Sequence, residues 1–120
     1  MKNYVQPGKV IDFVAAADVV SGQVVRIGQI IGVASADVAS GAVGQAHIEG
    51  VFSVPKVTGA VIAKGESLTW DASAAAFDDN AAVAASGDVQ GPPAVAFEAA
   101  GNGVLTLAVR LTGVPGTVTA

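Results

Sequence analysis

Glycine divides this chain into short apolar runs, and that spacing limits the folds open to it. Fifteen glycines occur among 120 residues, many of them beside Ser, Asp, Asn or Pro, the residues that favour turns. The runs between them are rich in Val and Ile, which favour strands. Short strands that alternate with turns every ~8–12 residues are typical of sandwiches and barrels. We therefore predict an all-β fold: a small single-domain β-barrel or β-sandwich of short antiparallel strands.

The C-terminal part of the chain carries the clearest alternation of apolar and polar residues. One face of the strand predicted at residues 104–112 carries Leu105, Leu107, Val109 and Leu111. Residues 94–100 alternate in the same way. The Gly-Asn-Gly sequence at 101–103 tolerates the positive φ angles of a tight turn. We predict that these two runs form a β-hairpin.

Weaker patterns predict the remaining strands, at residues 10–16, 23–27, 30–34, 44–50, 51–54 and 67–70. The second and third of these are two strands bent around Gly28 or one bulged strand. Pro55 ends its strand or places it at a sheet edge. Alanine-rich runs allow at most a short helical turn near residues 72–85. No internal repeat is expected.

A single domain accounts for residues 1–120. We interpret residues 1–8 as an N-terminal arm, either a clamp on a neighbouring subunit or an ordinary first edge strand. Residues 114–120 carry no charge and are expected to form an extended or flexible tail. The first residues contain no apolar signal segment. No apolar stretch reaches the ~18 residues of a spanning helix, so we expect no membrane partner.

Charge and cysteine content narrow the function classes. The net charge is −4, and the six basic residues are scattered singly. Nucleic-acid binding needs a cluster of basic residues that neutralises phosphates, so we expect no nucleic-acid partner. Because the chain has no cysteine, disulfides, thiolate zinc sites and cysteine nucleophiles are excluded.

Catalytic and ligand-binding motifs are also missing from the sequence. The one histidine, His47, has no metal-ligand partner at a recognisable spacing, and we interpret it as a surface or interface residue. Residues 78–80 lack the spacing of a calcium loop and are interpreted as a turn. The only Gly-Lys pair, Gly8-Lys9, does not belong to a phosphate-binding loop. We predict no catalytic, cofactor-binding or metal-binding residue, no small-molecule substrate and no enzymatic activity.

Several short motifs follow one another along residues 2–113. They are Lys-Asn-Tyr-Val-Gln-Pro-Gly at 2–8, Ser-Gly-Gln-Val-Val at 21–25, Glu-Gly-Val-Phe-Ser-Val-Pro-Lys at 49–56, Ala-Lys-Gly-Glu-Ser-Leu-Thr-Trp-Asp at 63–71 and Ala-Val-Ala-Phe-Glu-Ala-Ala at 94–100. In this order the chain resembles the capsid cement (head decoration) proteins of tailed phages and prophages. These are small β-rich proteins encoded beside the major capsid protein.

That resemblance implies a structural virion protein, made in the host bacterial cytoplasm and located on the outer surface of an icosahedral capsid. It implies homotrimers at threefold and quasi-threefold positions, with the major capsid protein as partner. The alternative is a tail or head–tail adaptor protein, and a small-ligand-binding barrel or enzyme accessory domain is a third class. The expected capsid or intersubunit contacts are Asn3, Tyr4, Val5, Gln6, Pro7, Phe52, Pro55, Lys56 and Trp70.

Overall fold

The computed structural model describes residues 8–120, and every regular element in this range is a strand. The strands are β1 (Val10–Val14), β2 (Val24–Ile27), β3 (Ile30–Ala34), β4 (Val43–His47), β5 (Glu49–Pro55), β6 (Ser67–Asp71), β7 (Ala76–Asp78), β8 (Val89–Ala96), β9 (Thr106–Thr112) and β10 (Thr117–Val118). The predicted all-β fold is confirmed. Residues 72–75 form a turn. Within residues 8–120 no helix is long and apolar enough to cross a membrane.

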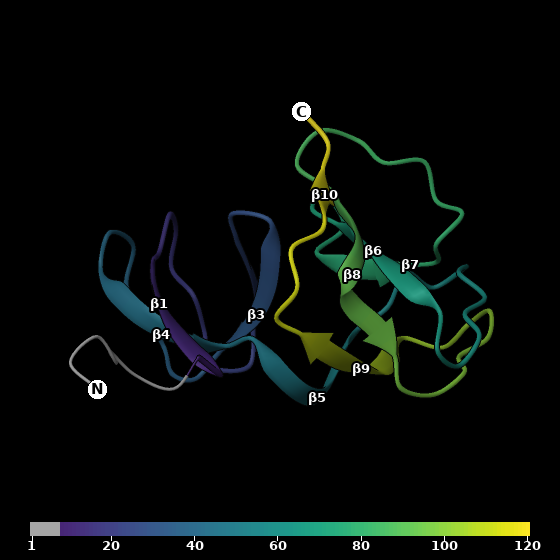
Figure 1. Cartoon of the computed structure of the whole chain (residues 1–120), viewed down its shortest axis with the longest axis horizontal. Coiled ribbons are helices and arrows are strands. Elements are labelled where there is room, and N and C mark those ends of the chain that lie inside the picture. Colours follow the sequence, from purple (N-terminus) through teal and green to yellow (C-terminus); the bar gives the residue numbers. More distant parts are fainter. Residues whose placement is uncertain (1–7) are drawn as a thin grey trace, which may run out of the picture.

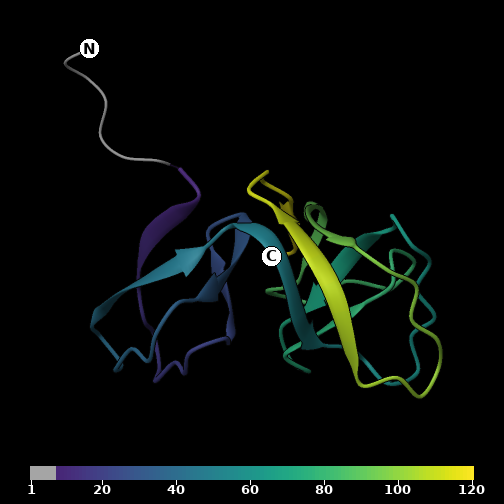
Figure 2. The same cartoon turned by 90° about the horizontal axis from the view of Figure 1, so that it is seen from below.

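The strands form two antiparallel sheets that lie side by side (Figure 1). The first sheet, here called the first module, contains β1 to β4 in the order β1-β4-β3-β2. The second module contains β5 to β10 in the order β5-β9-β8-β6-β7, with β10 paired to β8. Only Ile48 separates β4 from β5, so the chain passes directly from one sheet into the other (Figure 2).

The two modules share one topology. Without β7 and β10, the second-module order β5-β9-β8-β6 repeats the first-module order strand for strand. In each module the first strand pairs with the last and the second with the third, always antiparallel. β7 is an addition at the free edge of β6. A four-stranded unit therefore occurs twice in the chain.

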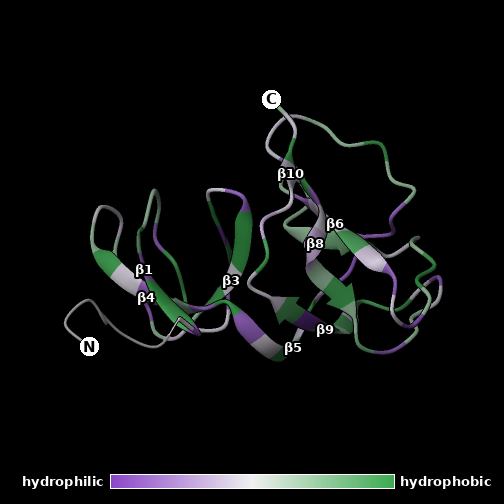
Figure 3. Ribbon diagram, in the orientation of Figure 1, coloured by the Kyte–Doolittle hydropathy of each residue, from purple (hydrophilic) through white to green (hydrophobic). Residues whose placement is uncertain are grey.

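Most of the apolar core belongs to the second module, although strands of both modules carry apolar residues (Figure 3). Its side chains include Leu68, Trp70, Phe77, Leu107 and Val109, with Val24, Ile31 and Val33 contributed by the first module. A separate, smaller cluster lies within the first module and contains Ala15, Val19, Ala34 and Val38. The first module thus has little core of its own.

β9 buries alternate residues, as predicted for its inner face: Leu107, Val109 and Leu111 are each at most 2% exposed. Leu105 lies before the strand and is 66% exposed. The predicted antiparallel pairing of the two runs is confirmed, but the tight connection at 101–103 is wrong. β8 and β9 do pair, but residues 97–105 form a long connection, because Ala100 forms a bridge with Ile62.

The end of β5 and the C-terminal residues both lie in the second module, and each has its own pairing. Pro55 is the last residue of β5, an edge strand in the sheet order, as expected for a residue without an N–H donor. Near the C-terminus, residues 117–118 form β10 and pair with β8. The Gly116 N–H also donates to Gln29 O in the first module at 2.8 Å.

Candidate functional site

Two loops of the first module hold each other through reciprocal hydrogen bonds. We call this pair, residues 15–23 and 35–42, the first clasp. At its centre Val19 and Val38 exchange backbone hydrogen bonds, both 2.8 Å long. The Gly22 N–H of one loop donates to Ala34 O at 2.9 Å, and the Gly41 N–H of the other donates to Ala15 O at 2.7 Å. The clasp therefore has an approximate twofold relation.

Two aspartates repeat that relation in their side chains. Asp37 Oδ1 accepts from the Ser21 N–H at 2.8 Å, and Asp18 Oδ1 accepts from the Ser40 N–H at 2.9 Å. Each carboxylate thus satisfies a backbone donor of the opposite loop, which would otherwise be left to solvent. The clasp is held by polar contacts as well as by its small apolar cluster.

The symmetry has a sequence basis, and the expectation of no internal repeat is wrong. Residues 14–24 read Val-Ala-Ala-Ala-Asp-Val-Val-Ser-Gly-Gln-Val, and residues 33–43 read Val-Ala-Ser-Ala-Asp-Val-Ala-Ser-Gly-Ala-Val. The glycines fit because Gly22 has φ 86° and Gly41 has φ 82°, a conformation that costs other residues ~1–2 kcal/mol. A comparison of the chain with itself would have found this repeat.

The second module contains an equivalent pair of loops, the second clasp, at residues 57–66 and 97–105. Here Ile62 and Ala100 exchange backbone hydrogen bonds of 2.8 and 2.9 Å. Gly65 N–H donates to Ala96 O at 2.8 Å, as Gly22 N–H donates to Ala34 O at 2.9 Å in the first clasp. The repeat seen in the topology therefore extends to the loops.

Lys56, one of the predicted contact residues, lies inside the second module and is 3% exposed. Its ammonium group donates to Val57 O at 2.9 Å, Thr58 O at 3.2 Å and Val104 O at 3.3 Å. Three carbonyls therefore satisfy its three donors. Lys56 ties the end of β5 to the second clasp.

The first module shows why a lysine is useful there. Its β1–β4 ladder runs straight into the clasp, where the Ala15 N–H donates to Ala42 O at 3.0 Å. In the second module the Lys56 N–H likewise donates to Leu105 O at 2.9 Å, but the clasp centre Ile62 lies six residues after Lys56, whereas Val19 lies only four after Ala15. The Lys56 side chain spans this added length.

The other predicted contacts fall into three environments. Trp70 is 7% exposed and packs against Phe77, with ring centroids 4.9 Å apart. Phe52 is half-buried, with its ring centroid 6.0 Å from that of His47, and Pro55 is exposed. Asn3, Tyr4, Val5, Gln6 and Pro7 lie outside the described residues. The described members of the predicted set do not meet in one site.

Sequence reasoning missed the apolar surface around the clasps. In the first clasp Val20 is 61% exposed, and beside the clasp Val14 and Val43 are each 68% exposed. Around the second clasp the exposed large apolar side chains are Val61, Phe97, Val104 and Leu105. In β1 Val14 stands on the same exposed face as Asp12, and alternation along the strand is the signal that could have found it. Val14 and Val43 are paired in the β1–β4 ladder, and adjoining exposed apolar side chains of this kind mark interaction sites.

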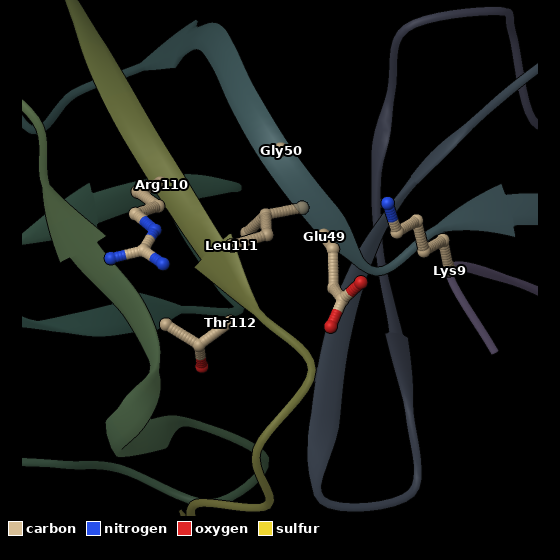
Figure 4. A pocket seen from close by; sticks show the side chains of 6 residues that line it. All are labelled: Lys9, Glu49, Gly50, Arg110, Leu111 and Thr112. Carbon is tan, nitrogen blue, oxygen red and sulfur yellow. The ribbon is translucent and has the colours of Figure 1, made fainter.

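An open hollow of about 370 Å³ lies where β1, β5 and β9 approach one another (Figure 4). Its lining residues are Lys9, Glu49, Gly50, Arg110, Leu111 and Thr112. The three charged side chains point in different directions (Figure 4). Within residues 8–120 no group of three or more His, Asp or Glu side chains is placed to hold a metal ion.

A family model described as phage cement protein matches residues 5–111, a range that includes both clasps. No curated protein matches the chain.

Proposed function

The chain belongs to the phage cement protein family, and we propose that it decorates the outer surface of a tailed-phage icosahedral capsid. Its role is structural, within the phage capsid. In the proposed assembly, homotrimers occupy threefold and quasi-threefold positions. There they bind the major capsid protein and hold neighbouring capsid subunits together.

The exposed apolar side chains at the clasps carry this proposal. Val20 in the first clasp and Val61 in the second are 61% and 65% exposed. Apolar surface removed from water contributes ~25 cal/mol per Å², so each contact is modest. A trimer makes several such contacts together, and their effects combine through multivalency.

The residues of the proposed contact set divide into two roles. Pro55, the half-buried Phe52 and the arm residues 3–7 are proposed to touch the capsid or a neighbouring copy. Lys56 and Trp70 are proposed to act from inside the second module, because both are buried. They hold the second clasp and its sheet in the shape that the partner meets.

The test adds purified protein to expanded, undecorated heads of its own phage. We expect addition at threefold positions by electron cryo-microscopy and greater resistance of the heads to heat, because a ligand of the native assembly stabilises it. Val20→Asp and Val61→Asp should weaken addition. Val83→Asp is the matched control, because Val83 is 95% exposed and lies outside both clasps.

Failure of the folded, unaltered protein to bind heads would reject the decoration role. Binding to tails or to the head–tail junction would favour the adaptor alternative. If Val83→Asp weakens addition as much as the clasp variants do, the clasps are not the contact surfaces.

A further inference from the structure

The second module contains one strand at a place where the first module has none. β7 pairs with the edge of β6 through Thr69–Asp78 and Trp70–Phe77. It also reaches the residues just after β5, because Phe77 forms a parallel bridge with Lys56 and accepts from the Val57 N–H at 2.9 Å. β7 therefore fills the gap between the second strand of its module and the end of the first.

The corresponding gap in the first module is open among the described residues. β2 occupies the position of β6, and its ladder pairs it with β3 alone. The pair Ile27–Ile30 closes the two-residue turn at 28–29, which makes it a hydrogen-bonded pair in such a hairpin. Bonded and outward-facing residues alternate in an antiparallel ladder. Val24 and Arg26 therefore direct their backbone N–H and C=O groups to the free edge.

A hollow of about 250 Å³ lies in this gap. One wall is formed by residues 13–19, which are the end of β1 and the start of the first clasp. The other wall is formed by residues 24–26 of β2 and by Gln23 before it. The apolar part of the lining is Phe13, Val14, Ala15, Ala16, Ala17, Val19, Val24 and Val25. In the second module the same gap receives Phe77, which is 0% exposed.

We propose that residues 3–5 of a second copy of this chain fill the gap, as an antiparallel strand on β2 with the Tyr4 ring in the hollow. The segment Asn3-Tyr4-Val5 has the pattern of Ala76-Phe77-Asp78, one aromatic residue between two shorter ones. Tyr4 is the only tyrosine of the chain. An aromatic ring with a polar end suits a hollow that is apolar inside and open to water.

The strand directions indicate that the arm comes from another copy. β1 runs antiparallel to β4, β4 to β3 and β3 to β2, so a strand antiparallel to β2 runs in the direction of β1. Residue 5 precedes β1 by only five positions, ~17 Å of extended chain. If Tyr4 stands beside Ala15 as Phe77 stands beside Lys56, Val5 lies beyond Ala15, about six residues or ~20 Å of strand from Val10. A copy's own arm would have to run back over that distance after its turn, which the five positions do not allow.

Each chain offers one such arm and one such gap beside β2, so exchange around a closed ring satisfies every copy. This inference rests on the proposed function, since it specifies how neighbouring copies of the decoration protein are joined. It assigns β2 and the hollow beside it to contact between copies, and leaves Val20 and the second clasp to meet the capsid.

Cysteine cross-linking tests the pairing, because the native chain has no cysteine. Arg26 and Thr69 each stand four residues after an equivalent clasp glycine, and Thr69 faces Asp78. Val5, at the position of Asp78, should therefore face Arg26. Directly opposed residues have Cβ atoms ~4.5–5.5 Å apart, close enough for a disulfide after small adjustments.

The experiment mixes Val5→Cys protein with Arg26→Cys protein, free in solution and on heads, under mild oxidation. We expect a 5–26 disulfide between two copies, identified by mass spectrometry of the linked peptides. Adding Tyr4→Ala to the Val5→Cys chain should lower its yield, whereas Tyr4→Phe should not. Val5→Cys mixed with Val83→Cys is the matched control and should remain unlinked.

The outcomes separate this inference from the proposed function. A protein that adds to heads but forms no 5–26 link in either setting overturns the arm exchange and leaves decoration intact. A protein that links but does not add to heads supports the exchange and rejects decoration. A link from residue 26 to the capsid protein in place of residue 5 also overturns the exchange.

Discussion

The first and second modules repeat one topology, yet they differ in what holds them together. The second module closes its gap with β7 and places the aromatic pair Trp70 and Phe77 inside. The first module has a cluster of four small or medium apolar residues, with Phe13 and Val25 packed against it. Three of its side chains join the core of its neighbour. The comparison teaches that the same unit is complete in one half of the chain and incomplete in the other.

The two clasps also differ in the side-chain contacts that hold them together. In the first clasp, Asp18 and Asp37 bond across the loops. Each of these aspartates lies four residues before a clasp glycine, and the residues at that position in the second clasp are Val61 and Ala99. There the buried Lys56 ammonium group bonds to a carbonyl of the clasp instead. Polar surface contacts thus support the module with the smaller core. The first module is the half that a partner can stabilise most.

The first prediction tests how much each module depends on its apolar core, by removing one aromatic side chain from each. Phe77→Ala should cost ~3–5 kcal/mol, the usual loss for a fully buried phenylalanine. Phe13→Ala should cost less, because Phe13 is only half-buried. Guanidinium unfolding followed by tryptophan fluorescence measures both. Equal losses would mean that the two modules depend on their cores to the same extent.

Strand positions could be predicted from the sequence because alternation and turn residues are local signals. The predicted runs at 23–27, 30–34 and 67–70 correspond closely to β2, β3 and β6. The tight hairpin at 101–103 failed because Ala100 bonds to Ile62, a partner far away in the chain. Local pattern cannot report such a competitor.

The interior position of Lys56 was equally hidden. A single lysine between Pro55 and Val57 looks like a solvated surface residue, and one of its acceptors, Val104 O, is 48 residues away. The exposed clasp valines were hidden for the opposite reason, since valine in a strand usually signals a core. Contact surfaces of an assembly violate the local rules that predict a fold.

The second prediction concerns Lys56. Lys56→Met keeps most of the apolar stem but leaves the carbonyls of Val57, Thr58 and Val104 without their ammonium donor. An unsatisfied buried acceptor costs ~1–3 kcal/mol, so we expect a loss of ~2–3 kcal/mol in the free energy of unfolding. Lys64→Met is the matched control and should stay within ~0.5 kcal/mol, because Lys64 is exposed. A silent Lys56→Met would mean that water replaces the ammonium at no cost.

The third prediction tests the twofold relation within the first clasp. Asp18→Ala and Asp37→Ala should each cost ~1 kcal/mol, because each removes one hydrogen bond at the surface. Their effects on amide hydrogen exchange should be reciprocal. Asp18→Ala should speed exchange at Ser40, and Asp37→Ala should speed exchange at Ser21. If either variant affects both amides equally, the clasp opens as one unit and the two halves are not separable.

The smallest expected effect concerns the turn into β7, the strand that only the second module has. Asp71 Oδ1 accepts from the Ser73 hydroxyl at 2.8 Å and from the Ser73 and Ala74 N–H groups, each at 3.1 Å. The Ser73 hydroxyl, followed by the Ala74 backbone, lowers the pKa of Asp71 below its ordinary value of 3.8, while burial opposes the shift. Because these bonds favour the charged carboxylate, their stabilisation is present above the unfolded pKa. It is lost as the pH falls through the lower folded pKa.

Asp71→Asn should therefore be slightly less stable than the native chain at neutral pH, by less than ~0.5 kcal/mol, since exposed polar pairs contribute little. The difference should shrink below about pH 4, where the native carboxylate begins to bind its proton. Melting temperatures at pH 7 and about pH 3 measure this. Ser73→Ala should raise the pKa of Asp71 towards its ordinary value in an NMR titration. In both variants faster amide exchange should be confined to residues 71–78, because the first module has no strand at this position. Faster exchange in β2 as well would mean that loosening β7 also destabilises the first module.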